Sequence, residues 1–343
     1  MRWRASVLVV SAAVAVAPWP WAWVDRWWAS RWYVTVQRVA TPLFTRLPWP
    51  AVDVLLGALI AWWGLQAVRD LRRTRADGVG LGRAVRAVAL RTVVTTAVLH
   101  VTFLGLWGLH YRRPPLMTQP AFRAAQVTDD AVRRLTAETV TTIAHLSLAA
   151  PDAVEPSDDA LAARVLEEAA RVGGLGQVVP APPRYSALDG YFRRVGIAGF
   201  TVPWTLETLV AGDVLPVERP MVVAHEWAHL AGLANEGEAS YVAWRACRTG
   251  THAEQYSAAL LLYLELRASL SREDRRTQDA ALSPRARRDM AAMAARDARE
   301  RSPWLSDAGW RAYDVFLKRN GVPAGTASYA DVVRLVLGLT PPA

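Results

Sequence analysis

Hydrophobic and polar positions divide the chain into an apolar first third and a mostly amphipathic remainder. Three long apolar runs lie in the first third, at about 5–24, 50–68 and 92–111. Each approaches the roughly 20 residues that a helix needs to cross a bilayer. We therefore expect residues 1–111 to form a membrane anchor with three transmembrane helices, and residues 112–343 to form a second domain.

Beyond residue 111, apolar positions recur mainly with the period of a helix. The pattern predicts helices over 121–149 and 158–172, and over most of the chain from 219 onward. Between them, turn residues, β-branched residues and aromatics are interleaved, and 195–202 with 208–210 predicts a short hairpin or an edge strand. The predicted fold class is mainly α (α+β), with transmembrane helices before a helix-rich domain that carries a small β element.

Arginine and tryptophan positions indicate how the anchor is oriented. Segment 69–91 holds seven arginines, and the positive-inside rule places it in the cytoplasm together with Arg2 and Arg4. Three crossings then put everything after Tyr111 outside the cytoplasm. Eleven of the 16 tryptophans precede that residue, as expected at membrane interfaces. The tryptophans and regularly spaced arginines of segment 25–48 predict a stretch along the outer interface.

Two features of the anchor have a second interpretation. Run 5–24 also has the shape of a signal peptide, but Pro18 directly after its small-residue pattern argues against cleavage. His100 and His110 lie in the third run, where a titratable group can be functional, yet without a visible partner they are expected to be packed or interfacial.

The net charge of +9 does not indicate nucleic-acid binding. The 40 basic residues are dispersed over helical stretches, and no aromatic-basic motif or zinc finger appears. Much of the excess lies in segment 69–91, where membrane topology explains it. The single cysteine, Cys247, excludes a disulfide within the chain and is expected to be a buried apolar residue. The oligomeric state stays open.

The segment "HEWAH", residues 225–229, carries the clearest chemistry. His225 and His229 are four residues apart, so both imidazoles lie on one face of a helix and reach one ion. Zinc is the expected occupant, because two neutral nitrogens and a carboxylate leave one position open. Glu226 would be the general base. The apolar "MVVA" begins this helix and Gly232 ends it.

Two later glutamates compete for the place of third ligand. If a second helix starts at Glu236, its apolar stripe consists of Ala239, Val242, Ala243 and Ala246. Glu236 lies near this stripe, where a carboxylate is costly unless it has a partner such as zinc. Glu238 points away from the stripe, so we expect Glu236 to bind the metal and Glu238 to be solvated or to support the site from outside.

The stretch "HEWAHLAGLANEGEASYVAWRAC" resembles an uncharacterised family of bacterial membrane proteins of unknown function, which implies a zinc peptidase of the HExxH type. The likeness extends to "YRRPPL", "GIAGFTVPWTLETL", "EQYSAALLLYLEL" and "AYDVFLKRNGVPAGTASYADVVRLVL". More distantly, Glu236-x-x-Ala239-Ser240 resembles the third-ligand helix of membrane gluzincins of the CAAX prenyl protease type, which implies Glu236 as ligand. Ser240 stands where those families have Asp or Asn. The Gly232 spacing is similar to that of metzincins, but Asn235 occupies the place of their third histidine.

A zinc hydrolase also needs a group that stabilises the oxyanion. Tyr256 is the chosen candidate, and His252 and Arg267 are the alternatives, although for each of them taken singly a packing or surface role is the favoured interpretation. Segment 194–203 is expected to align a peptide by strand addition.

These observations predict a membrane-anchored zinc metallopeptidase of the bacterial cytoplasmic membrane, with its catalytic domain outside the cytoplasm. Zn²⁺ would be held by His225, His229 and Glu236, with Glu226 as base, and the partners would be a peptide or protein substrate and the lipid bilayer. Two alternatives remain. One is a non-catalytic envelope sensor or scaffold with a structural zinc, and the other is a zinc amidase that acts on cell-wall material.

Overall fold

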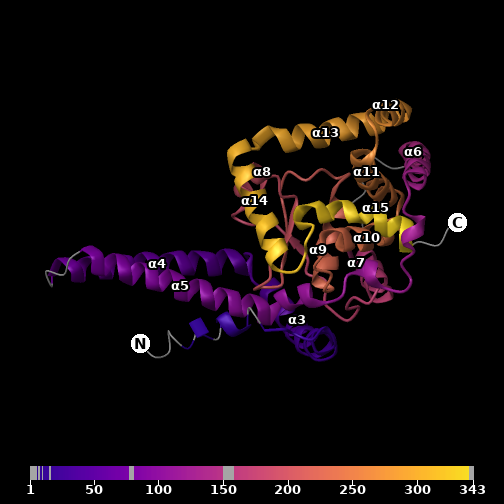
Figure 1. Ribbon diagram of the computed structural model, residues 1–343. Coiled ribbons are helices and arrows are strands. Elements are labelled where there is room, and N and C mark those ends of the chain that lie inside the picture. The colour runs from indigo at the N-terminus through magenta and orange to yellow at the C-terminus, as the bar shows by residue number, and fades with distance from the viewer. Residues whose placement is uncertain are drawn as a thin grey trace.

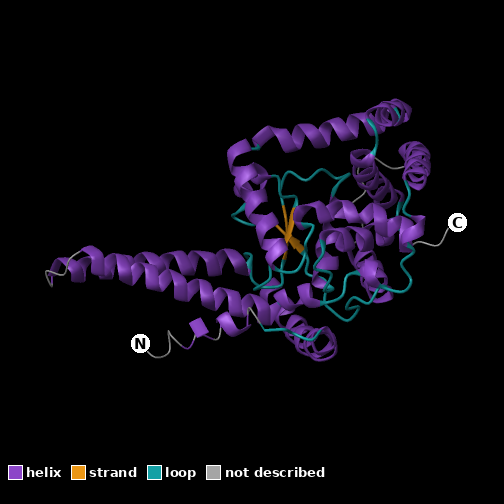
Figure 2. Ribbon diagram, in the orientation of Figure 1, coloured by secondary structure: helices purple, strands orange, loops and turns teal. Residues whose placement is uncertain are grey.

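The computed structural model describes residues 6, 8–9, 11–14, 17–76, 81–149 and 158–339. A long helical hairpin projects from a body of packed helices (Figure 1). The body contains one small sheet (Figure 2). A mainly helical chain with a small β element confirms the predicted fold class at that level.

The hairpin consists of α4 (Ala51–Ala76) and α5 (Leu81–Leu106), which lie side by side. Each contains a stretch long and apolar enough to cross a membrane, Ala51–Arg73 and Val85–Leu106, and few residues of either are buried. The second apolar run is therefore helical as predicted. The third helix starts earlier than predicted and ends at Leu106, because the backbone leaves the helical conformation at Trp107 and continues as η2 (Gly108–Arg112).

The chain before the hairpin forms a helical stretch along the body: α2 (Trp21–Trp23), the π-helix η1 (Val24–Tyr33) and α3 (Val34–Thr45). Trp28 and Tyr33 are buried against the body, whereas Trp27 and Trp32 are exposed. Within the first predicted run, residues 6, 8–9 and 11–14 are helical but Ala17–Pro20 are not, since two prolines interrupt the helix there. Its other residues before position 17 lie outside the described part.

The body is built around α9 (Arg219–Leu230), whose residues are largely buried. It packs against α10 (Glu236–Cys247), α7 (Asp158–Arg171) and α11 (His252–Ser269). Tyr33 and Trp107 belong to the same hydrophobic core as Ala228 and Leu230 of α9. Residues on both sides of position 111 therefore share one core.

The remaining elements surround this centre. The helix predicted over 121–149 starts later, at Asp129, after a series of short turns. The other elements are η3 (Leu116–Thr118), η4 (Ala124–Gln126), α6 (Asp129–Ala149), α12 (Arg272–Ala281), α13 (Pro284–Glu300), α14 (Pro303–Arg319), η5 (Gly325–Ala330) and α15 (Asp331–Leu339).

The sheet has the strand order β1-β3-β2, so β2 lies at an edge. β2 (Gly199–Thr201) pairs antiparallel with β3 (Thr208–Val210), and β1 (Pro183–Arg184) pairs parallel with β3. The predicted hairpin is confirmed, but its first strand is shorter than expected, because α8 (Asp189–Val195) occupies the preceding residues. β1 was not predicted from the sequence.

Candidate metal centre

A tight turn joins the helix of the "HEWAH" segment to the next helix. After α9, Gly232 has φ +84°, and a Cβ atom at this position would lie 2.8 Å from the His110 ring. A position with a left-handed backbone conformation that is pressed against an imidazole accommodates only glycine. Asn235 then caps α10, because its side chain accepts hydrogen bonds from the backbone N–H groups of Gly237 and Glu238. The turn thus brings the start of α10 back over the last turns of α9.

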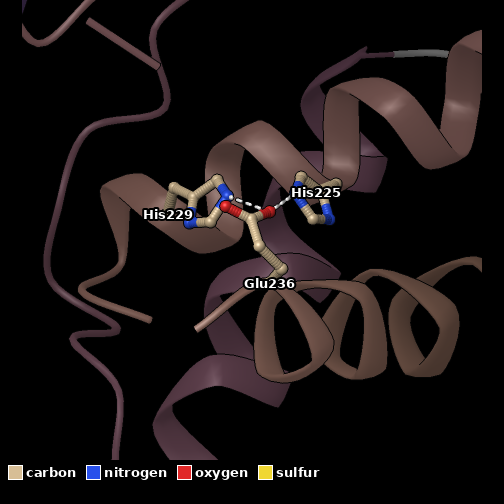
Figure 3. A group of neighbouring side chains, drawn as sticks. All are labelled: His225, His229 and Glu236. Carbon is tan, nitrogen blue, oxygen red and sulfur yellow. Dashed lines mark hydrogen bonds and ion pairs between the residues drawn. The ribbon is translucent and has the colours of Figure 1, made fainter. Parts of the chain in front are cut away.

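His225, His229 and Glu236 converge as a result (Figure 3). The Oε2 atom of Glu236 lies 3.1 Å from His225 Nε2 and 3.4 Å from His229 Nε2. Among the described residues, these three side chains form the group whose ligand atoms lie close enough to hold one metal ion, all within 4.8 Å of one another. Two imidazole nitrogens and one carboxylate oxygen are a donor set that suits zinc.

The other ring nitrogens of both histidines are held by neighbours. His229 Nδ1 donates to the Leu233 carbonyl at 2.7 Å, and His225 Nδ1 lies 3.1 Å from the Ser240 hydroxyl. Such outer contacts fix the orientation and tautomer of metal-binding histidines. Ser240 thus contacts a histidine from the position where the membrane gluzincins named above carry Asp or Asn.

Burial and the attraction between opposite charges shift the pKa values of this cluster in opposite directions. Burial has the largest single effect and lowers the pKa of His229, but Glu236, Glu226 and the Leu233 carbonyl together raise that pKa to about 9. Burial raises the pKa of Glu236, yet the two imidazoles hold it well below its usual range. Glu236 is therefore a carboxylate, and its charge attracts a cation to the nitrogens. A metal ion must displace the proton from His229, so its binding is coupled to pH.

The Glu226 side chain extends from α9 toward the edge strand β2. The Thr201 hydroxyl is 2.9 Å from Glu226 Oε2 and 2.8 Å from the Glu226 carbonyl oxygen. A Cβ atom at Gly199 would lie 2.6 Å from Glu226 Oε1, so the backbone of β2 passes directly over the carboxyl group. Burial raises the pKa of Glu226, and the nearby imidazoles counteract part of this effect. Its affinity for a proton is therefore higher than that of an exposed glutamate.

Three tyrosines cover the centre from elements far apart in the sequence. Tyr313 of α14 donates a hydrogen bond to Glu236 Oε1, and Tyr111 of η2 lies beside Tyr313. The Tyr329 ring lies nearly parallel to the His225 ring, at 7° and 6.4 Å between centroids, and its hydroxyl lies near Glu236. Burial, followed by the Glu236 charge, raises the pKa of Tyr313 and Tyr329 well above the usual value. Both are therefore neutral hydrogen-bond donors.

The sequence analysis missed these tyrosines and chose Tyr256 instead. Tyr256 lies in a separate hydrophobic cluster, and its hydroxyl donates to Asp289 at 2.7 Å. Arg267 pairs with Asp279, and His252 is exposed at the start of α11. The structure brings none of the three to the cluster. The family resemblance gave no signal to choose among them, because Tyr256 lies in a segment that carries it, as do Tyr111, Tyr313 and Tyr329.

Glu238 is not solvated, contrary to the expectation from the helix pattern. Its side chain is buried, and Oε1 accepts a hydrogen bond of 2.7 Å from the Leu116 backbone N–H. Burial raises the pKa of Glu238 to about 7. The chain after the hairpin, at η3, covers the face of α10 that would otherwise meet water. Glu238 therefore fastens this turn to α10.

His110 is packed, as predicted, but not within a candidate membrane helix. It is buried in η2, and the rings of Trp28, Tyr33 and Trp107 lie 4.8, 4.4 and 5.9 Å from it. Burial lowers its pKa well below the usual value, so the ring is neutral. This aromatic cluster supports the glycine turn after α9.

The fold and the site together define a helix-rich protein with two helices apolar enough to span a membrane and a buried His-His-Glu cluster. Residues 28–337 match the model of the family described as Protein of unknown function (DUF3810), and the chain belongs to this family. No curated protein and no solved structure matched the chain. The predicted membership of an uncharacterised family is confirmed.

Proposed function

We propose that the protein is a membrane-anchored zinc metallopeptidase that cleaves polypeptides outside the cytoplasm. The observation that supports this most directly is the convergence of His225 Nε2, His229 Nε2 and Glu236 Oε2, with Glu226 beside them. The apolar hairpin with its arginine-rich far end supports the anchor and its orientation.

Both the side chains that would bind zinc and the groups that contact those side chains fit a zinc site. His225, His229 and Glu236 would hold the ion, while Ser240, the Leu233 carbonyl and Tyr313 orient these ligands. Three protein ligands are typical of catalytic zinc, whereas structural zinc has four. Among the described residues, the cluster offers three ligands, which favours a catalytic zinc over a structural one. When bound, zinc lowers the pKa of a water molecule and polarises a carbonyl group.

Glu226 would move the proton during hydrolysis. Its carboxylate accepts the proton of the attacking water and delivers it to the nitrogen of the leaving amine. The raised pKa of Glu226 suits the first step, because a stronger base accepts the proton of the water more readily. Thr201 positions the group by its contact with Oε2.

The edge strand would bind the substrate. Ala198 O and Val202 N bond toward β3, so the alternation of an antiparallel ladder turns the main-chain groups of Gly199 and Thr201 to the open side. No strand of the described residues pairs with this side. An extended peptide added there would run beside Glu226.

Tyr329→Phe is expected to lower kcat by about 10²–10³-fold without loss of metal, the usual effect of removing one donor to an oxyanion. The charges of both Glu236 and Glu226 act on the Tyr329 hydroxyl, which therefore lies near the proposed base as well as the proposed ligand, whereas Tyr313 donates its hydroxyl proton to Glu236. Steady-state kinetics and metal analysis of the purified variant provide the measurement. Tyr256→Phe is the control and should retain the wild-type kcat. An unchanged kcat in Tyr329→Phe would exclude Tyr329 as the stabilising group.

Metal removal tests the proposed function itself. The full chain purified in detergent should contain about one zinc per chain, as a single three-ligand centre requires. Dialysis against a chelator should abolish hydrolysis of peptide libraries or envelope proteins, and added zinc should restore it. Protein that lacks stoichiometric metal, or that keeps its hydrolytic activity after complete removal of zinc, would contradict the proposal.

A further inference from the structure

The turn between β2 and β3 is fixed to both helices of the hairpin. The buried Glu207 carboxylate accepts hydrogen bonds from the N–H groups of Ala51, at 2.8 Å, and Val52, at 3.1 Å. It therefore caps the first turn of α4, where a negative charge is favourable. Trp204 Nε1 donates to the Leu99 carbonyl of α5 at 3.2 Å, and its ring contacts Phe103. These contacts connect the sheet directly to both helices of the hairpin.

This connection sets how far the edge strand lies from the bilayer. Leu99 lies within the stretch of α5 that is apolar enough to cross a membrane. Thr201, the last residue of β2, precedes Trp204 by three residues, which span at most about 10 Å even when fully extended. The other side of β2 packs on α9, where Thr201 contacts Glu226. Figure 2 shows the strands between the root of the hairpin and the helices of the body.

Exposed tryptophans lie near the end of the hairpin that joins the body, where Trp32 Nε1 donates to the Gly105 carbonyl of α5 at 2.9 Å. Trp49 is exposed two residues before α4 begins, and Trp27 and Trp32 are exposed on η1. Tryptophan prefers the boundary between lipid and water. Toward the body, Tyr33 donates to the Leu230 carbonyl at 2.7 Å, and Trp107 donates to the His229 carbonyl at 3.2 Å. The last turn of α9 is therefore bonded directly to elements that would lie at the membrane surface.

From this arrangement we infer that the substrates are membrane-tethered polypeptides, cleaved in an extended segment within about ten residues of the bilayer. This inference rests on the proposed function. The distance of about 10 Å between β2 and the part of the turn that contacts the hairpin corresponds to about three extended residues of a substrate. The polar layer of the membrane surface adds several more residues between the cleavage site and the hydrocarbon core. A tethered segment also reaches β2 at a high effective concentration, which a soluble protein lacks.

The positions of cleavage in cells test this inference. Newly formed protein N-termini would be mapped by mass spectrometry in membranes of cells that produce the full wild-type chain or its Glu226→Gln variant. The termini that require Glu226 should cluster within about ten residues of a transmembrane segment or a lipid-modified residue. Termini that require Glu226 but are spread over soluble envelope proteins would overturn the inference and leave the peptidase function intact. Identical termini in both cell types would contradict the peptidase function, and the inference with it.

A reconstituted reporter provides the quantitative comparison. A sequence found cleaved in cells would be placed about 5 or about 40 residues from a single transmembrane anchor in liposomes that contain the full chain, or supplied as a free peptide. We expect the near position to be cleaved at least about tenfold faster than the other two. Equal rates at all three would overturn the inference. If the wild-type chain and Glu226→Gln cleave the reporters at the same rate, the peptidase function is contradicted instead.

Discussion

Glu226→Gln is expected to reduce kcat by about 10²–10⁴-fold, the usual contribution of a general base, while the zinc content stays unchanged. The amide keeps the size of the side chain and its contact with Thr201, but it cannot accept the proton of the attacking water. Glu226 is not among the three converging ligands, so the metal should remain bound. Single-turnover kinetics and metal analysis of the purified variant are the measurements.

The matched control for this variant is Glu138→Gln on α6. Glu138 is an exposed helical glutamate outside the metal centre, so its substitution should change neither kcat nor the metal content. If Glu226→Gln retains full activity, the proposed role of Glu226 is wrong. If it also loses its zinc, Glu226 contributes to metal binding, and the assignment of the three ligands needs revision.

Glu236→Gln is expected to have the second large effect, the loss of the metal. The variant removes the one carboxylate that faces both Nε2 atoms. Loss of an outer partner typically weakens metal binding about 10–100-fold, and loss of a ligand should exceed that. Competition with a chelator of known affinity measures the change, and hydrolysis should be lost in parallel.

Glu238→Gln is the control two residues away. Glu238 is bonded to the Leu116 N–H, and its pKa of about 7 means that it is partly neutral already near neutral pH. A neutral glutamine can accept the same hydrogen bond, so this variant should keep its zinc and its activity. If only Glu238→Gln loses zinc, the ligand assignment is wrong, although an enzyme with another third ligand would remain possible.

Features that depend on one helix or one short segment could be predicted from the sequence. His225 and His229 share a face because a helix turns once in 3.6 residues. Gly232 ends α9 because the chain takes a left-handed conformation there. The apolar runs predicted α4 and α5, although prolines interrupt the first apolar run and the non-helical Trp107 ends α5 earlier than predicted. Periodicity locates a helix better than it locates the ends.

Features that depend on two distant segments could not be predicted. Helix geometry indicated that Glu238 points away from the stripe of α10, but not that η3 covers this direction. It did not indicate that Tyr313 and Tyr329 reach Glu236 from the last part of the chain. No local pattern distinguishes these tyrosines from Tyr256, which also lies on a helix.

The sequence by itself determined the residue pattern that the proposed chemistry needs: two histidines in helical register, a glutamate between them and apolar stretches long enough for a bilayer. The tertiary structure decided which acid meets the histidines, which tyrosines cover them, and that Glu207 and Trp204 tie the edge strand to the hairpin. The reason is physical. A helix or strand period states which residues share a face, whereas the element that packs on that face follows only from burial of the whole chain.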